Sequence, residues 1–205
     1  QQGEYEVVGF IPVGMTYMML KTPTLYKVTD LKNNRIGVLA EVPPQTALVR
    51  SVRAQPVALS FDNAIKAFKS NQVDILPVPV YALLAYNLRK EFGESTRVIN
   101  FPVVYAGLNI VIRAAEYPSD FGVNMRHWFA GQARVLVGQV IRWENRLPAY
   151  YWMDVSATEK QAYNVVIAKV RNQYSQNFFY DPRFVKLIKK LRCKDEPQYF
   201  ECQIW

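Results

Sequence analysis

The chain has 205 residues, of which half are hydrophobic and a fifth are charged. This length suits one large domain or two small lobes. The 13 Tyr, 11 Phe and 4 Trp exclude a disordered chain, which carries too few aromatic residues to bury a core. No stretch approaches the ~20 apolar residues of a membrane-spanning helix, so no membrane insertion is predicted. The formal net charge is +8, which raises nucleic acid or an anionic membrane as a partner.

The first half of the sequence predicts an alternation of strands and helices. Strands are expected at Tyr5–Leu20 (one or two), Arg35–Ala40, Pro56–Leu59, Val73–Leu76, Val98–Val104 and Gly107–Arg113. Helices are expected at Pro43–Arg53, from a cap at Ser60 to a stop at Asn71, and at Tyr81–Lys90. Strand, helix, strand, helix, strand in this order is typical of right-handed crossovers and a parallel sheet.

The second half is predicted to be mainly helical. Helices are expected at Met125–Glu144, from Ser156 to about Gln173, and from Asp181 onward. Ser156 with Glu159 has the pattern of a capping box, and Asp181 followed by proline is a typical helix start. These patterns divide the chain into inter-lobe strands with a connector (1–29), an α/β lobe (30–112) and a C-terminal helical region (113–205).

The excess positive charge lies in the last quarter of the chain. Within Arg183–Leu191, the apolar residues have helical spacing and the lysines fall on the opposite side. We therefore interpret the basic run as the solvated face of an amphipathic helix. This interpretation is favoured over a nucleic-acid site, so no nucleic-acid partner is predicted.

The cysteines and the histidine restrict the possible chemistry. A single histidine, His127, excludes a multi-histidine metal site. Cys193 and Cys202 close a short loop, which favours a disulfide, and with it an oxidising compartment, over a two-thiolate metal site. The first residues lack the basic start and apolar core of a signal peptide, so we interpret the chain as mature, trimmed or a fragment.

A catalytic function is not predicted. The sequence has no phosphate loop, no nucleophile elbow and no metal-spaced cluster. The carboxylate pairs Asp154 with Glu159 and Asp62 with Asp74 fall at helix or strand starts. His127 is expected to be packed or half-exposed on a helix rather than catalytic. We predict no enzyme activity, no cofactor and no metal.

A binding function is better supported. In open parallel sheets, ligands lie beyond the carboxyl ends of the strands, where helices begin. The corresponding segments here are 40–46, 60–62 and 78–81, which offer helix N-termini, polar side chains and aromatic walls. This mixture suits a small polar or amphipathic solute. Ordinary loops and caps are an equal alternative at this point.

Three segments of the predicted lobe carry a recognisable pattern: Asp30–Val38, Arg53–Val57 and Ala64–Asp74. They resemble type II periplasmic solute-binding proteins, especially the solute receptors of TRAP transporters. Two positions depart from that family. Its carboxylate-binding Arg falls on Gly37, and its Asn-bearing loop falls on Ile75–Pro79. The resemblance therefore implies the fold, but an organic-acid ligand is doubtful.

A closer resemblance covers nearly the whole chain and is carried by Tyr5–Gly9, Asn100–Val104, Val111–Arg113, Tyr117–Gly122, Arg192–Cys193 and Phe200–Cys202. These segments resemble the AdeT-type solute-binding proteins, a group also labelled as RND efflux components linked to aminoglycoside resistance. The resemblance implies an α/β fold: a type II periplasmic-binding-protein-like lobe with a parallel-rich sheet, followed by C-terminal helices. It also implies that a first-lobe segment precedes Tyr5 in this group and is missing here, so an oligomer or a companion N-terminal fragment is expected to cover exposed apolar surface.

The resemblance implies a non-enzymatic, periplasmic protein that closes its lobes around a small-molecule solute for a membrane transporter. The candidate contacts are Tyr17, Glu41, Gln45, Phe61, Tyr81 and Tyr105. Glu41 is an acid at a strand end with no Arg beside it, which favours a cationic or amine-bearing solute. The predicted solute is therefore small and polar or amine-bearing. The alternative is a ligand-free accessory protein associated with RND-type efflux or aminoglycoside resistance.

Overall fold

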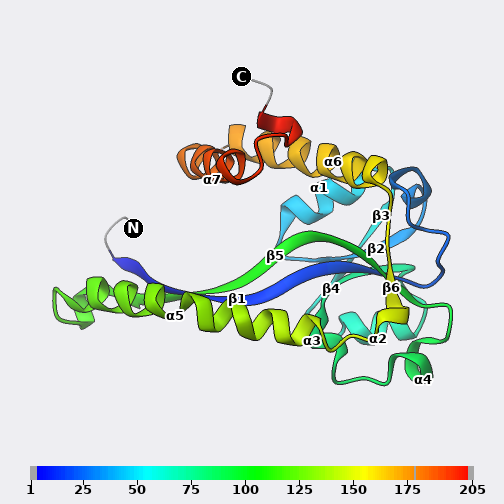
Figure 1. Ribbon diagram of the computed structural model, residues 1–205, viewed down its shortest axis with the longest axis horizontal. Coiled ribbons are helices and arrows are strands. Elements are labelled where there is room, and N and C mark those ends of the chain that lie inside the picture. The colour runs from blue at the N-terminus through cyan, green and yellow to red at the C-terminus, as the bar shows by residue number, and fades with distance from the viewer. Residues whose placement is uncertain (1–3, 178, 203–205) are drawn as a thin grey trace.

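The computed structural model describes residues 4–177 and 179–202. Its centre is a six-stranded sheet with the strand order β3-β2-β4-β1-β5-β6 (Figure 1). The strands are β1 (Tyr5–Leu20), β2 (Arg35–Leu39), β3 (Gln55–Leu59), β4 (Ile75–Pro79), β5 (Arg97–Arg113) and β6 (Trp152–Met153). β2 is parallel to β3 and β4, and β6 is parallel to β5. β1 is antiparallel to both of its neighbours, so the sheet is mixed, with parallel pairs in the majority.

Helices cover both faces of the sheet. The helices are α1 (Pro43–Ser51), α2 (Ala64–Lys69), α3 (Val80–Leu83), α4 (Leu88–Phe92), α5 (Phe121–Glu144), α6 (Ala157–Gln176) and α7 (Pro182–Asp195), with short 3-10 turns at Val28–Leu31, Ala114–Glu116, Ala149–Tyr151 and Phe200–Cys202. In Figure 1, α1, α6 and α7 lie above the sheet, and α2, α3 and α5 lie below it. Among the described residues, none of these helices has the length and apolar character needed to cross a membrane.

Two hydrophobic clusters, one on each face, form the core. Tyr17 and Met19 of β1 belong to the cluster below the sheet, which also contains Phe68 of α2. Met18 and Leu20 belong to the cluster above it. Successive side chains of a strand point to opposite faces. The end of β1 is therefore buried on both sides, which explains its unbroken apolar sequence.

β1 and β5 form a long two-stranded ribbon that extends well beyond the short strands (Figure 1). Their pairing runs from Tyr5 opposite Arg113 to Leu20 opposite Arg97, with several register shifts. Apolar side chains are exposed on the outer half of this ribbon: Val7, Phe10, Tyr105, Leu108 and Val111. The expected surface of exposed apolar residues is therefore present.

Several sequence predictions need correction at the level of single elements. The two strands expected at 98–104 and 107–113 form one continuous strand, β5, because β1 pairs along its whole length. The helix expected at Tyr81–Lys90 is two short helices, since Asn87 caps a new helix by accepting a hydrogen bond from the Lys90 amide. Asn63, not Ser60, is the N-cap of α2, and its side chain accepts the Ser60 amide.

Other local predictions are confirmed. Asn71 has a φ of 58° after α2, in the left-handed region that asparagine tolerates. The Ser156 hydroxyl accepts a hydrogen bond from the Glu159 amide at the start of α6. Asp181 accepts from the Arg183 amide at the start of α7. The division of the chain into residues 1–29, 30–112 and 113–205 stays a prediction, although the one sheet takes strands from all three ranges.

Candidate functional site

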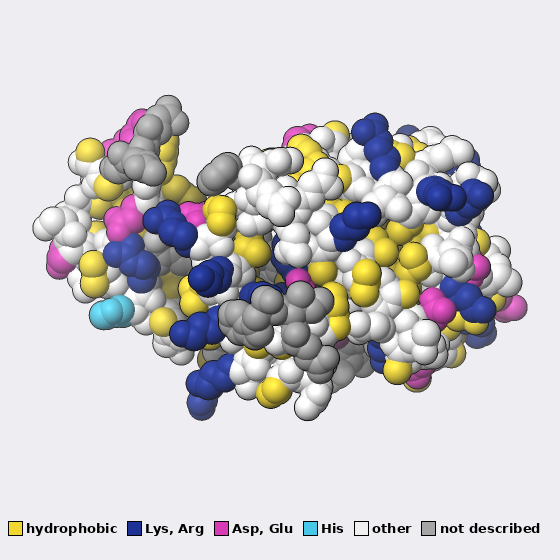
Figure 2. Space-filling view, turned by 90° about the horizontal axis from the view of Figure 1, so that it is seen from above, with side chains coloured by type: hydrophobic (Ala, Val, Ile, Leu, Met, Phe, Trp, Pro, Cys, Tyr) yellow, Lys and Arg dark blue, Asp and Glu magenta, His cyan; other side chains and the backbone are white. Residues whose placement is uncertain are grey.

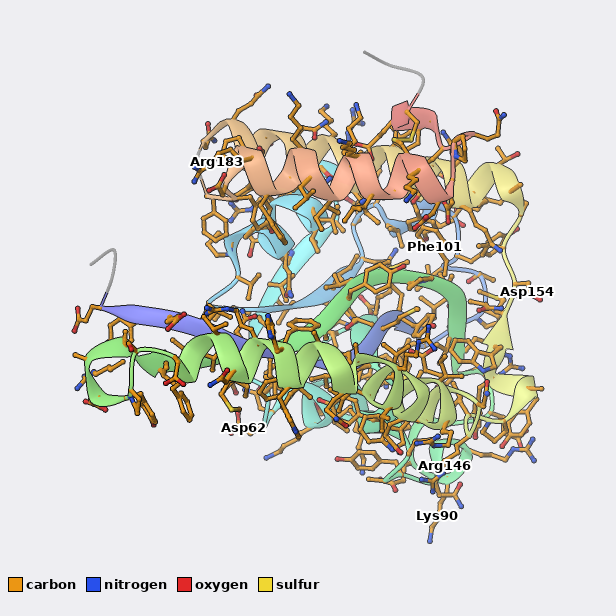
Figure 3. All side chains as sticks on the ribbon, turned by 60° about the vertical axis from the view of Figure 1, so that its left-hand side comes forward. Asp62, Lys90, Phe101, Arg146, Asp154 and Arg183 are labelled. Atoms are coloured by element: carbon orange, nitrogen blue, oxygen red, sulfur yellow. A yellow bond between two sulfur atoms is a disulfide. The ribbon has the colours of Figure 1, made fainter. Side chains whose placement is uncertain are left out.

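A cavity of about 620 Å³ lies between the sheet and the C-terminal helices. This volume falls within the range of typical small-molecule sites. Figure 3 shows Phe101 of β5 on the side of the sheet that faces α6 and α7. The main walls come from the N-terminus of α1 (Val42, Pro44, Gln45, Leu48), from β5 (Phe101–Tyr105), from α6 (Asn164, Ile167, Arg171), from α7 (Phe184, Val185, Ile188, Arg192) and from the tail (Glu196, Tyr199).

The position of the cavity agrees with the rule for ligand sites in open sheets. β2 ends at Leu39 and α1 begins at Pro43, so the cavity reaches the carboxyl end of a parallel strand. The Gln45 side chain accepts a hydrogen bond from the Leu39 amide at 2.8 Å. This bond ties the first turn of α1 to the end of β2 and fixes that wall of the cavity.

Charged side chains enter the cavity from α6, α7 and the tail. Arg171 and Arg192 both donate hydrogen bonds to Oε2 of Glu201, the bond from Arg192 being 2.7 Å long. Glu201 is only 7% exposed, and a buried carboxylate requires such partners. The cavity is therefore lined by two arginines that share one buried counter-ion.

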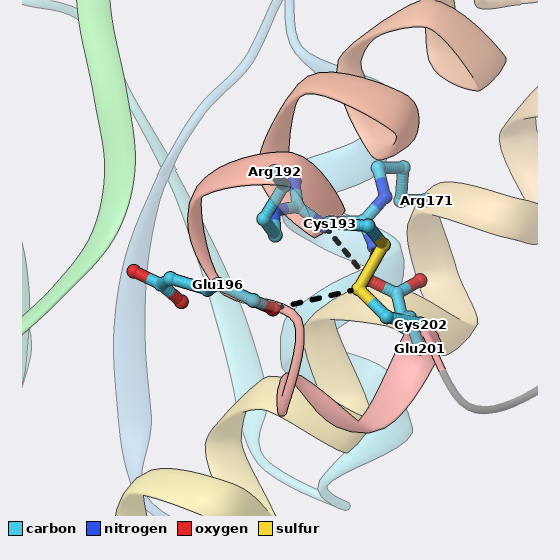
Figure 4. The surroundings of a disulfide bond; sticks show 6 residues. All are labelled: Arg171, Arg192, Cys193, Glu196, Glu201 and Cys202. Atoms are coloured by element: carbon cyan, nitrogen blue, oxygen red, sulfur yellow. Dashed lines mark hydrogen bonds and ion pairs between the residues drawn. A yellow bond between two sulfur atoms is a disulfide. The ribbon is translucent and has the colours of Figure 1, made fainter.

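The expected disulfide between Cys193 and Cys202 is present, and it holds Glu201 in place (Figure 4). It joins the end of α7 to the 3-10 turn that carries Glu201. The amide of Glu196 donates to the Arg192 carbonyl at 2.7 Å, which continues the chain from α7 into this loop. The covalent link thus brings Glu201 back onto Arg192.

Two tyrosines complete the polar lining. Burial raises the pKa of Tyr180 and that of Tyr199 above the ordinary value, although the nearby arginines oppose this shift. Both phenols are therefore neutral at physiological pH and can donate hydrogen bonds. The guanidinium of Arg192 also lies 5.1 Å from the centre of the Tyr199 ring, a cation–π contact.

The structure brings only part of the predicted contact set together. Gln45 and Tyr105 line the cavity. Glu41 and Phe61 are exposed and lie outside its lining, with Phe61 72% exposed.

Tyr17 and Tyr81 lie on the other face, against α5. The Tyr17 hydroxyl is 3.4 Å from Oε2 of Glu144, and burial together with that carboxylate raises the pKa of Tyr17. The Tyr81 ring lies 6.0 Å from that of Trp143. A contact between solute and Tyr17, Tyr81, Glu41 or Phe61 stays a prediction.

Sequence interpretation missed Arg171, Arg192 and Glu196, because it assigned the C-terminal charges to a solvated face. That interpretation holds for much of the surface: Figure 2 shows many Lys and Arg side chains on the face of the molecule seen from above. The disulfide loop was the available signal. It joins the end of a basic helix to acidic residues at 196 and 201, which predicts local ion pairs.

Gly37 of β2 is the residue on which the sequence resemblance places the carboxylate-binding arginine of TRAP receptors. A Cβ atom there would lie 2.8 Å from Cδ1 of Leu59 and 2.9 Å from Cδ1 of Leu76. Two leucines therefore fill the space that a longer side chain would need. The side chains nearest to Gly37 are thus apolar.

The described residues do not assemble a set of ligands for a metal ion. Among residues 4–177 and 179–202, no group of three or more His, Cys, Asp or Glu side chains could hold a metal ion. His127 lies on a helix, α5, as expected, but it is exposed rather than packed or half-exposed.

Residues 1–205 match the family model described as "Solute-binding protein AdeT 1/2". The chain belongs to this family. It is 55% identical over 199 residues to "Probable solute-binding protein AdeT2" of Acinetobacter baumannii, a match that covers 97% of this chain and 84% of that protein. It is 30% identical to "Probable solute-binding protein AdeT1" of the same organism, covering 98% of this chain and 66% of that protein.

Solved structures of TRAP periplasmic solute-binding proteins share the fold of this AdeT-family chain. One from Desulfovibrio salexigens, with bound orotic acid, has a TM-score of 0.71 at 14% identity, covering 91% of this chain and 61% of its own. One from Haemophilus influenzae, with bound L-gulonate, has a TM-score of 0.71 at 10% identity, covering 91% and 63%. The chain thus spans about three fifths of the length of these structures. Family and neighbours are solute-binding proteins rather than enzymes.

Proposed function

We propose that this chain is a periplasmic receptor that captures a small polar or amine-bearing solute for a membrane transport system. The observation that carries the proposal is the 620 Å³ cavity at the carboxyl end of β2, in a chain of a solute-binding family. The disulfide Cys193–Cys202 supports an oxidising compartment such as the periplasm. The cavity does not favour the alternative of a ligand-free accessory protein.

The surroundings of Gly37 argue against a ligand held in the manner of the TRAP receptors. The neighbours were solved with organic acids such as orotic acid and L-gulonate. Here Leu59 and Leu76 fill the space around Gly37. Any recognition of a charged group must therefore come from other residues, and the cavity offers Arg171, Arg192 and Glu196.

The long strands β1 and β5 suit the role of a connection between two lobes. They extend beyond the short strands, and their outer halves carry exposed apolar side chains such as Phe10 and Leu108. We expect a further lobe, either a companion fragment or part of a second copy, to pack on this surface. Hinge-like closure over the cavity would then occur along the ribbon.

Native mass spectrometry tests the proposal directly. We expect the purified chain to carry an excess of roughly a few hundred daltons, which fits the cavity volume and disappears on denaturation. Ile188→Trp, which places a large ring in the cavity, should reduce the bound fraction. The matched control is Val135→Trp, a change at a 62% exposed position of α5. A chain that is bare in repeated preparations, with no difference between the variants, would contradict the proposal.

A further inference from the structure

The charged groups of the cavity are few and come from α6, α7 and the tail. Its lining contains three charged side chains, Arg171, Arg192 and Glu196. The remaining lining is apolar, aromatic or neutral, and includes Phe101 and Phe184. In such a site, a small number of polar groups sets the orientation and selectivity of the ligand. The three charged side chains therefore indicate which charged groups a solute in this cavity would carry.

The two arginines retain donors that Glu201 does not use. Each guanidinium has five N–H donors, and one bond from each side chain reaches Oε2 of Glu201. Two positive charges are thus balanced by one carboxylate. The side chains of Arg171 and Arg192 are 23% and 26% exposed, so the donors remain accessible from the cavity. A planar guanidinium with free donors suits a carboxylate or a phosphate.

Glu196 provides the opposite charge. Figure 4 shows its carboxylate extending away from the disulfide and from the Arg192 guanidinium. Glu196 is exposed, and among the described residues its carboxylate makes no ion pair and no side-chain hydrogen bond, while its backbone amide is bonded to the Arg192 carbonyl. The Glu196 carbonyl accepts a hydrogen bond from the Tyr199 amide at 3.0 Å, a normal distance for such a bond, and the disulfide closes the loop behind it. An acceptor for a cation is therefore held at the cavity wall.

Together these groups line one cavity with two arginines, which share one buried carboxylate, and with a further carboxylate that is exposed. A solute with a single charge can pair with the arginines or with Glu196, but not with both. A solute with both charges satisfies both. We propose that the cavity binds a zwitterionic solute with an apolar body, with its ammonium group at Glu196 and its anionic group at Arg171 and Arg192. This inference rests on the proposed function.

Three probes with the same aromatic ring separate the charges. Phenylalanine carries both charges, phenethylamine only the ammonium group, and 3-phenylpropionate only the carboxylate. We expect the oxidised, full chain to bind phenylalanine at least about tenfold more tightly than either of the other two, measured by isothermal titration calorimetry at low salt. Equal affinities for phenylalanine and a singly charged probe would overturn the inference.

Two charge-removing variants assign the ends of the solute. Glu196→Gln should lower the affinity for phenylalanine to about that for 3-phenylpropionate, whose own affinity stays unchanged. Arg192→Gln should lower the affinity for phenylalanine to about that for phenethylamine, whose own affinity stays unchanged. Glu94→Gln is the control, because its 83% exposed side chain lies outside the cavity. If Glu196→Gln leaves phenylalanine binding unchanged, the ammonium site is not at Glu196 and the inference fails.

The failure of this inference is distinguishable from the failure of the proposed function. If a solute co-purifies and Ile188→Trp displaces it, but no probe binds below about 10 mM, the zwitterion preference is wrong and the receptor function stands. If no solute co-purifies and no probe binds, both are wrong.

Discussion

The α/β lobe and the C-terminal tail are stabilised by different means. In the lobe, Phe68, Val73 and Ile75 are fully buried. In α7, no described residue is buried, and Phe184 and Leu187 are at least half exposed. The tail is held by a disulfide and by ion pairs instead. Apolar burial therefore maintains the sheet, whereas covalent and charged contacts position the groups that line the cavity.

The charged side chains that line the cavity thus lie mainly on the part of the molecule with little apolar burial. Segments with few buried contacts open at lower free-energy cost than core elements. We therefore expect the tail to open locally while the sheet stays folded. Perturbing each region should therefore give separable results, with the largest loss of stability in the lobe.

The largest effect is expected for Phe68→Ala. The Phe68 ring is 0% exposed and contacts the Phe92 ring at a centroid distance of 5.8 Å. Removing it should lower the free energy of unfolding by about 3–5 kcal/mol, a large fraction of the stability of a typical domain. Urea denaturation followed by circular dichroism measures this loss. Phe184→Ala on α7 is the matched control, with an expected loss below about 1 kcal/mol. Equal losses would refute the contrast.

The same contrast explains what the sequence could predict. Some elements depend only on the spacing of apolar residues over a short stretch and on Pro or Asn at its ends. A short stretch of sequence is therefore enough to predict them, as for β2, α1, β3 and the helix end at Asn71. The apolar spacing of α7 is also local, and it predicts the helix correctly. It does not predict that the apolar side remains open and lines a cavity through Phe184 and Ile188.

The cavity could not be predicted from short stretches of sequence. Its walls combine residues near 42–48, 101–105, 164–171 and 180–199, which only the tertiary structure brings together. The strand-end rule pointed to Gln45, which lines the cavity because α1 starts directly after β2, and its contact with a solute stays a prediction. It could not place Tyr17, whose side chain points to the opposite face against Glu144. A strand end specifies an edge of the sheet, and pairing and bulges decide the face.

An intermediate effect is expected when the disulfide is removed by Cys193→Ser together with Cys202→Ser. The sequence separation of 9 corresponds to about 2–3 kcal/mol in the loop-closure description. Because the tail has few buried contacts, the loss should be local: amide hydrogen exchange should accelerate over 182–202. The amides of β2 and β4 should keep their protection. If those strands also lose protection, the tail and the lobe unfold as one cooperative unit and are not stabilised separately.

The smallest effect is expected for the charged pair of the lobe, Arg35 with Asp74. The Arg35 Nε and a terminal nitrogen donate to the Asp74 carboxylate at 3.0 and 2.6 Å. These hydrogen bonds hold the pKa of Asp74 below its ordinary value. The ionised carboxylate therefore stabilises the folded state above the ordinary carboxyl pKa of about 4, and this contribution is lost as the pH falls through the lowered pKa.

Asp74→Asn should therefore cost about 1 kcal/mol at neutral pH, since the pair is partly exposed and screened by solvent. At a pH of about 2, the difference between the variant and the parent chain should shrink, because protonation already removes the charge in the parent. Urea midpoints at the two pH values measure both quantities. Glu116→Gln, in the exposed pair with Arg113, serves as the control with no expected change. A loss at Asp74 as large as that of Phe68→Ala would mean that charge, and not apolar burial, dominates the stability of the lobe.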